Sequence, residues 1–272
     1  MREISGHYVE VDGIKTYYES CGDTGPVVLM LHTAGRDCRQ WHGVMEELGA
    51  RYRTIAFDLP GHGKSWPLPD IYCLQDIGEI AGWIDRFATA IGAASFVMMG
   101  CSLGGNIALL LAARNPRVVA ALALEGVDWS PVLSETSLDL LTHPQVNLMH
   151  SNMDYSMSLV GSEATPEGRA FSEWGVLSLI PLAQQGCLRA YSRCDFRDET
   201  GNIRVPVMLL RGTEDWAVSK DQVEATAGRL TNAARVTVEE IEGIGHFPHL
   251  EAPATIAERT LAFLDDLDLR GA

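Results

Sequence analysis

The sequence predicts an α/β protein in which a mostly parallel sheet has helices on both faces and carries an inserted α-helical cap. Continuous apolar runs without alternation indicate strands that are buried on both faces, and amphipathic segments between them indicate helices. This alternation stops after Glu125 and resumes only near the start of the final quarter of the chain. We therefore predict a core built from residues 1–127 and 203–272, with residues 128–202 as the cap.

The elements follow one another in order along the chain. Two alternating segments flank Asp12 and Gly13, a turn pair that predicts an amino-terminal hairpin. The buried strands that follow are VVLML, TIAF, FVMMG and VVAALALE. The helices between them have apolar residues at three- and four-residue spacing and end at Gly or before Pro: WHGVMEELG, DIGEIAGWIDRFATAIG and LGGNIALLLAARNP. The strand and helix alternation resumes with VPVMLLRG, KDQVEATAGRL, ARVTVEEI and ATIAERTLAFLDDL.

The cap segment contains helical pieces rich in Met, Leu and aromatic residues. Such side chains fill a cap core, and they also form adaptable apolar surfaces against a ligand. On the second interpretation we expect Trp129, Met153 and Trp174 to contact substrate.

Composition limits the partners. The chain of 272 residues has 21 basic and 36 acidic residues and a formal charge of -15, which argues against nucleic acid and anionic membranes as partners. The amino terminus has no apolar signal segment, and no run approaches the roughly 20 apolar residues of a membrane span. Six cysteines without CxxC spacing predict neither a metal site nor a disulfide framework. We expect a cytoplasmic protein with a small-molecule substrate. The sequence is also compatible with a homodimer.

The stretch Gly100-Cys101-Ser102-Leu103-Gly104 fits the pattern G-x-S-x-G. It follows an apolar strand and opens an apolar helix, the setting in which a tight turn exposes a serine and directs helix-terminal N–H groups at an oxyanion. The two glycines remove side chains that would collide across the turn.

Further segments follow in the order that the α/β-hydrolase superfamily has. The chain resembles this superfamily, and specifically its serine esterase and lactonase branch with a helical cap. LHTAG lies where the family has its oxyanion loop, and FDLPGHGKS resembles the turn after the fourth strand. RGTEDWAV resembles the loop that carries the acid, and GIGHFPHLEAP resembles the loop that carries the histidine. The resemblance covers nearly the whole chain.

The resemblance implies a catalytic triad. Ser102 is then the nucleophile, His246 is its general base and later acid, and Asp215 orients the imidazole. The backbone N–H groups of Ala34 and Leu103 would form the oxyanion hole. Thr33 stands where the family usually has Gly, so Thr33 is a second candidate donor.

Other residues near these motifs leave alternatives open. Glu125, at the end of the sixth strand, is an alternative acid, because some members, including the zearalenone lactonases, resemble that arrangement and share a G-C-S-x-G elbow. Cys101 is expected to be a packed, inert thiol. His32 is expected to brace the oxyanion loop, His62 to be structural, and His249 to be solvated or to cap a helix.

The implied activity is cofactor-free hydrolysis of a neutral, moderately apolar carboxylic ester or lactone through an acyl-enzyme. Charged acyl groups are expected to be poor substrates because the chain itself is negative. The resemblance also allows three alternative functions: C–C bond hydrolysis of a vinylogous diketone, cofactor-free ring-cleaving dioxygenation, and a ligand receptor with slow turnover.

Overall fold

A computed structural model describes residues 2–67, 74–140, 142–143, 148–267 and 269 of the chain. It contains one eight-stranded sheet with the strand order β1-β2-β4-β3-β5-β6-β7-β8. Strands β1 and β2 pair antiparallel with each other and β2 pairs antiparallel with β4, whereas the other pairs are parallel. The strands are β1 (Ser5–Val11), β2 (Ile14–Cys21), β3 (Val27–Leu31), β4 (Arg53–Phe57), β5 (Phe96–Cys101), β6 (Val118–Leu124), β7 (Val207–Gly212) and β8 (Val236–Ile241).

The predicted amino-terminal hairpin is confirmed. Strands β1 and β2 pair in register from Ser5 opposite Ser20 to Val11 opposite Ile14. The two residues between them, Asp12 and Gly13, have φ values of 53° and 78°. A two-residue turn with positive φ at both positions matches the twist of the flanking strands.

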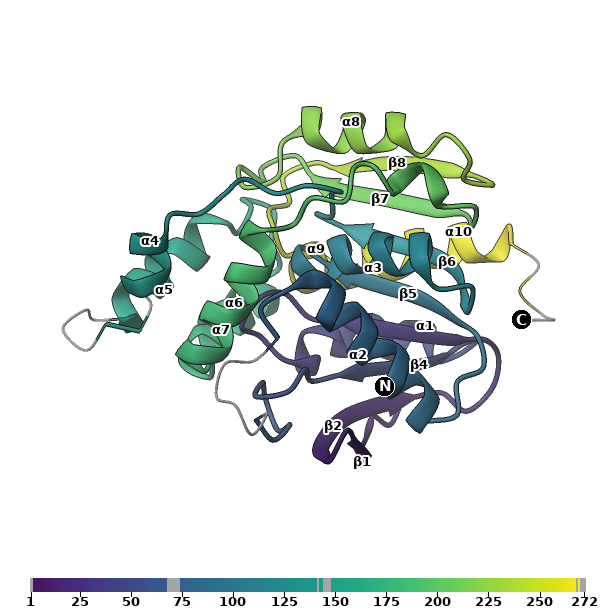
Figure 1. The fold of residues 1–272 in the computed structure, drawn as a ribbon, viewed down its shortest axis with the longest axis horizontal. Coiled ribbons are helices and arrows are strands. Elements are labelled where there is room, and N and C mark those ends of the chain that lie inside the picture. The colour runs from purple at the N-terminus through teal and green to yellow at the C-terminus, as the bar shows by residue number, and fades with distance from the viewer. Residues whose placement is uncertain (1, 68–73, 141, 144–147, 268, 270–272) are drawn as a thin grey trace.

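Helices cover both faces of the sheet (Figure 1). One face packs against α2 (Ile77–Ala90), α3 (Leu103–Arg114) and α8 (Lys220–Arg229), and the other packs against α1 (His42–Leu48) and α10 (Pro253–Asp265).

The strand β3 shows why the apolar runs are continuous. Its residues Leu29 and Leu31 belong to the core on one face, and Val28 and Met30 belong to the core on the other. Successive side chains of a strand point to opposite faces, so a strand buried on both sides is apolar at every position. The predicted fold class is confirmed.

A helical region is inserted between β6 and β7 and extends to one side of the sheet (Figure 1). It contains α4 (Glu135–Leu140), α5 (Leu148–Ser158), α6 (Pro166–Leu177) and α7 (Pro181–Ser192). The remaining short helices are η1 (Cys38–Trp41), η2 (Thr200–Asn202) and α9 (Pro248–Glu251).

The two connections of the helical region lie together. Trp129, on the way in, forms an isolated β-bridge with Asp195, on the way out. Beside them the buried carboxylate of Asp128 accepts two hydrogen bonds of 2.6 Å from the Arg229 guanidinium on α8. A buried, bidentate pair of this kind fixes the base of the region to the core.

Five of the six cysteines fall in the described residues, and all five are buried; Cys73 lies outside the described residues. Among the described helices, none has the length and apolar composition needed to cross a membrane.

Candidate active site

Ser102 occupies a strained turn between β5 and α3. Its backbone has φ 57° and ψ -119°, a region that residues other than glycine rarely adopt. The turn is held by hydrogen bonds from the Ser102 N–H to Leu124 O, at 2.8 Å, and from the Asn106 N–H to Ser102 O, at 2.9 Å. Strain that surrounding structure maintains is characteristic of functional sites.

The two glycines of the motif are required by close approach of backbone segments. A Cβ on Gly100 would lie 2.2 Å from Gly104 O, and a Cβ on Gly104 would lie 2.6 Å from Leu31 O. The helix α3 therefore starts directly against the ends of β5 and β3, which places Ser102 above the carboxyl edge of the sheet.

His246 forms a buried pair with Asp215. Their Nδ1 and Oδ2 atoms are 2.7 Å apart, and Asp215 Oδ1 also accepts a hydrogen bond of 2.7 Å from the Ala217 N–H. Burial alone would raise the pKa of Asp215, but the charge and hydrogen bond of His246 lower that pKa to about 2. Burial opposes protonation of the imidazole, but Asp215 raises the pKa of His246 above its usual value.

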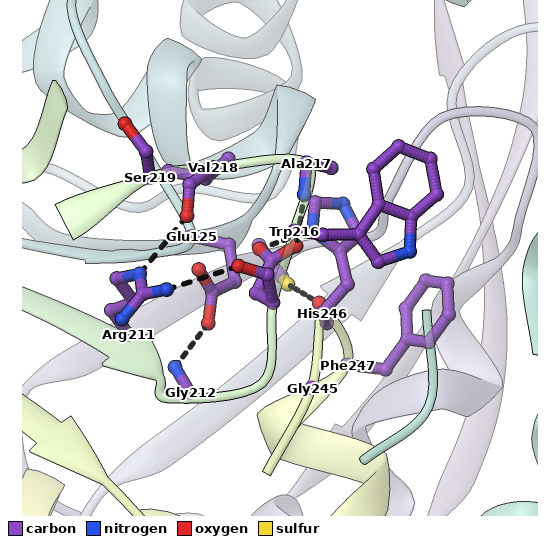
Figure 2. Close-up of polar contacts among 12 residues, drawn as sticks. Glu125, Arg211, Gly212, Trp216, Ala217, Val218, Ser219, Gly245, His246 and Phe247 are labelled. Atoms are coloured by element: carbon purple, nitrogen blue, oxygen red, sulfur yellow. Dashed lines mark hydrogen bonds and ion pairs between the residues drawn. The ribbon is translucent and has the colours of Figure 1, made fainter. Parts of the chain in front are cut away.

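Glu125 is completely buried next to this pair, and Figure 2 shows its contact with Gly212. Its Oε1 accepts a hydrogen bond of 2.5 Å from the Gly212 N–H, and its Oε2 has no donor among the described residues. One side-chain N or O atom from each of Glu125, Asp215 and His246 lies within 4.8 Å of the others. The structure thus brings both candidate acids together, with Asp215 on the imidazole.

Burial, reinforced by the charge of Asp215, raises the pKa of Glu125 well above its ordinary value. These effects favour the protonated form of Glu125, and its interaction with Asp215 helps to keep the pKa of Asp215 low. Two buried carboxylates this close would repel each other, so the pair favours a state with one proton and one negative charge.

The two residues predicted for the oxyanion hole lie at the same edge. Leu103 is the first residue of α3, where backbone N–H groups have no acceptor within the helix, and Ala34 lines the cavity that contains Ser102. The alternative donor Thr33 is committed elsewhere, because its N–H and its hydroxyl both bond to Gln40 Oε1, at 3.0 and 3.2 Å.

His32 supports the loop that contains Ala34 through two hydrogen bonds. Its Nδ1 lies 2.8 Å from Thr33 O, and its Nε2 accepts a hydrogen bond of 3.2 Å from the Leu59 N–H. These two contacts require the neutral ring with its proton on Nδ1, and burial lowers the pKa of His32 to about 4.

Glu251 is a positioning residue that the sequence analysis missed. Its buried carboxylate accepts hydrogen bonds from the N–H groups on either side of His246, at 2.7 Å from Gly245 and 2.9 Å from Phe247. It also accepts one of 2.9 Å from Gly161, just after α5. The sequence signal was an acidic residue five positions after the histidine in an otherwise apolar segment.

Ser102 and His246 line one cavity of about 280 Å³, which lies between the sheet edge and the helical region. Within the described residues their side chains make no direct hydrogen bond. Serine–histidine contacts of this kind often tighten only when a substrate binds.

The helical region lines the cavity with residues other than those predicted. Trp129 is half-buried with the Arg197 guanidinium 5.6 Å from its ring centre, and Trp174 is 41% exposed beneath Arg39. Neither these two nor Met153 is among the described residues that line the cavity. The residues that do include Tyr155, Ser156, Gln184, Leu188 and Tyr191.

One face of α7 supplies three of the lining residues. Residues 184, 188 and 191 are four and three positions apart, so they share one face of the helix. Residue type alone favoured Trp and Met, whereas helical phase decides which side chains face the cavity.

Three neighbouring residues were predicted to be structural or solvated. Cys101 is buried and its Sγ lies 3.3 Å from His246 O, and burial raises the pKa of its thiol well above the ordinary value. The His62 Nε2 lies 3.2 Å from Cys187 Sγ in the core. The expectation of a solvated or capping His249 is wrong, since its side chain is only 1% exposed and its ring centre lies 4.4 Å from that of Trp41.

Among the described residues two clusters have the residue types of a metal site, and most of their side-chain atoms already have partners, Glu125 Oε2 excepted. Asp58 accepts from the N–H groups of Cys38 and Lys64, at 2.7 Å each, and Asp37 is ion-paired with Arg39 at 2.6 Å. The second cluster is the Glu125, Asp215 and His246 group itself.

Comparison with known proteins places this fold in a family. A model of the alpha/beta hydrolase fold matches residues 26–253. The pimeloyl-acyl-carrier-protein methyl ester esterase of Nitrosomonas europaea is 26% identical over 251 residues, which are 87% of this chain and 94% of that protein. The structure of the enol-lactonase from Burkholderia xenovorans LB400 superposes with a TM-score of 0.84 at 20% identity, and the match covers 95% of this chain and all of the other.

A further relative matches only in part. The dihydrolipoyllysine-residue acetyltransferase component of the acetoin cleaving system of Cupriavidus necator is 33% identical over 117 residues, which are 43% of this chain and 30% of that protein. From the family model and the fold together, the chain belongs to the α/β-hydrolase fold family.

Proposed function

We propose that the protein is a serine hydrolase that cleaves a carboxylic ester or lactone through an acyl-enzyme intermediate. The observation that carries the proposal is a serine in a strained turn after β5 that shares a cavity with a buried His–Asp pair. The esterase among the relatives supports the same reaction class.

On this proposal each group has a role in acylation. Because Nδ1 of His246 bonds to Asp215, its proton lies there and Nε2 is free to accept the Ser102 hydroxyl proton. Ser102 Oγ then attacks the carbonyl carbon, and the N–H groups of Ala34 and Leu103 stabilise the oxyanion. The ester C–O bond breaks, and the leaving oxygen takes the proton from His246.

Deacylation reverses the order. His246 takes a proton from water, the resulting hydroxide attacks the acyl carbon, and Ser102 leaves with the proton that His246 returns. The buried, ionised Asp215 stabilises the imidazolium in both halves. Leu133, Leu159 and Leu188 give the cavity an apolar side that suits a short acyl chain or ring.

Substitution of the two adjacent nucleophile candidates tests the proposal. Against p-nitrophenyl esters of graded chain length and a lactone panel, Ser102→Ala is expected to lose at least about 10⁴-fold in kcat, because covalent catalysis is removed. Cys101→Ala is expected to retain most of its activity, since this thiol packs behind the turn. Inactivation of the wild type, but not of Cys101→Ala, by a thiol reagent would reverse the assignment.

A further inference from the structure

Arg36 is a buried cation whose hydrogen-bonding capacity is mostly unused. Arg36 lies two positions after Ala34 in the chain and is only 8% exposed. The guanidinium donates one hydrogen bond of 3.0 Å, from Nη2 to Ser156 Oγ on α5, and Nη1 has no partner among the described residues. Burial lowers the pKa of Arg36 to about 10, so the group remains charged near neutral pH.

No described carboxylate pairs with this charge. The adjacent Asp37 forms its ion pair with Arg39 instead, with Nη2 and Oδ2 2.6 Å apart. A cation that is removed from water without a counter-ion costs several kcal/mol. The folded protein therefore holds a site that an anion would stabilise.

The position of the guanidinium connects that site to catalysis. Arg36 lines the same cavity as Ser102 and His246. The guanidinium lies between two helices. It donates a hydrogen bond to Ser156 on α5 and packs against Gly175 on α6, where a Cβ would lie 2.7 Å from Nη1. A charge fixed in this way can select and orient a substrate.

We propose that Arg36 binds a carboxylate carried by the substrate, so that the substrate is an ester or lactone with one carboxylate besides the bond that is cleaved. This inference rests on the proposed function. A carboxylate fits better than a phosphate, because Arg36 is the sole Lys or Arg among the described residues lining the cavity. A phosphate dianion would leave one charge unpaired, whereas one carboxylate matches one guanidinium and the neutral Ser156 hydroxyl.

The proposal departs from the neutral substrate expected from net charge. The formal charge of -15 acts on an anion from a distance, and salt screens that repulsion over about 8 Å at physiological ionic strength. A contact inside the cavity is screened far less. The local cation therefore decides specificity, and the net charge affects mainly the rate of encounter.

The decisive measurement compares two esters that differ in one charge. Mono-p-nitrophenyl glutarate carries the carboxylate, and p-nitrophenyl pentanoate is a neutral ester of similar length. The wild type is expected to have the higher kcat/KM for the glutarate. Arg36→Met is expected to lower that value by about 10-fold to about 100-fold, the range of a charge-assisted hydrogen bond, with a much smaller change for the pentanoate.

Two variants separate a contact from a general charge effect. Arg189→Met removes a guanidinium on α7 that pairs with two residues of α4, Asp139 at 3.1 Å and Glu135 at 3.4 Å, and that does not line the cavity. It is expected to leave the ratio between the two esters unchanged. Arg36→Lys is expected to retain part of the preference. If Arg36→Met does not fold, competitive inhibition of wild-type pentanoate hydrolysis by free glutarate but not by pentanediol supports a carboxylate site in the cavity, and no inhibition by glutarate overturns the proposal.

The outcomes distinguish this inference from the function on which it rests. Ser102-dependent hydrolysis without preference for the glutarate ester, or an equal loss on both esters in Arg36→Met, overturns the role of Arg36 and leaves the hydrolase intact. If neither ester is hydrolysed, calorimetry of mono-p-nitrophenyl glutarate binding to Ser102→Ala with and without Arg36→Met decides the binding question alone. Binding that the Arg36 substitution does not weaken overturns it.

Discussion

At the scale of single residues, the site depends on how two buried carboxyl groups divide their charge. His246 and the Ala217 N–H stabilise the anion of Asp215. Glu125 accepts a hydrogen bond only from the Gly212 N–H, and a charge on it would be repelled by Asp215. Burial and the charge of Asp215 therefore favour the protonated form of Glu125. In such a pair the two groups are chemically identical, but their partners give them different roles.

This division predicts opposite results for two amide substitutions. Asp215→Asn is expected to lower kcat by about 10⁴-fold with little change in KM, because the amide cannot hold the required tautomer or stabilise the imidazolium. Glu125→Gln is expected to cost less than about tenfold, since its NH₂ group can donate to Asp215 as the protonated acid does. The measurement is steady-state kinetics of both variants on one ester.

The pH profile is an independent readout of the same pair. Activity requires neutral His246, so the rate rises with pH through the pKa of that residue, which Asp215 raises. Loss of the Asp215 charge should move this limb to lower pH, and Glu125→Gln should leave it in place. An inactive Glu125→Gln with an active Asp215→Asn would make Glu125 the triad acid.

At the scale of elements, the approach of α3 to the sheet is the most demanding feature of the site. Gly104→Ala would place a Cβ 2.6 Å from Leu31 O and 3.1 Å from His32 O, and both are backbone atoms that cannot rotate away. We expect a loss of about 3 kcal/mol in the free energy of unfolding, because the start of α3 must shift. Urea denaturation of the purified variant gives the value.

Gly228→Ala is the matched control. This glycine lies in α8 and has open space where a Cβ would be built. Alanine is a better helix former, so the control is expected to gain about 0.5–1 kcal/mol. If Gly104→Ala were as stable as the wild type, the close contact between α3 and the end of β3 would not exist in solution.

At the scale of the whole molecule, three buried histidines determine how the fold responds to acid. Burial lowers the pKa of His32 to about 4, and the pKa values of His62 and His249 to about 3. In the unfolded chain a histidine takes up its proton near pH 6.5. The unfolded state therefore binds more protons below that pH, and stability falls as the pH decreases from about 6.5.

His249 offers the cleanest test, because neither of its ring nitrogens has a partner among the described residues. His249→Phe keeps a ring against Trp41 but cannot titrate. The free energy of unfolding of the wild type should fall by about 2 kcal/mol more than that of the variant between pH 7.5 and pH 5. The difference at pH 8 reports packing alone, and equal slopes in both proteins would show that His249 does not contribute.

The fold class can be predicted from the amino-acid pattern, since the evidence for it is local. A strand buried on both faces must be apolar at each position, as in β3, and a turn such as Asp12-Gly13 shows itself in two adjacent residues. The pattern around Ser102 likewise predicted a strand, a turn and a helix in one short stretch, and the structure has all three.

Which distant side chains act together depends on how the folded chain brings them into contact. Asp215 and Glu125 are both acids at strand ends, and the opposite directions in which their pKa values shift depend on their burial and on their different partners. Glu251 reveals its role only through the three N–H groups that converge on it. The unpaired charge of Arg36 is invisible in a sequence with many acidic residues, because pairing depends on distance and burial and not on how many opposite charges the chain contains.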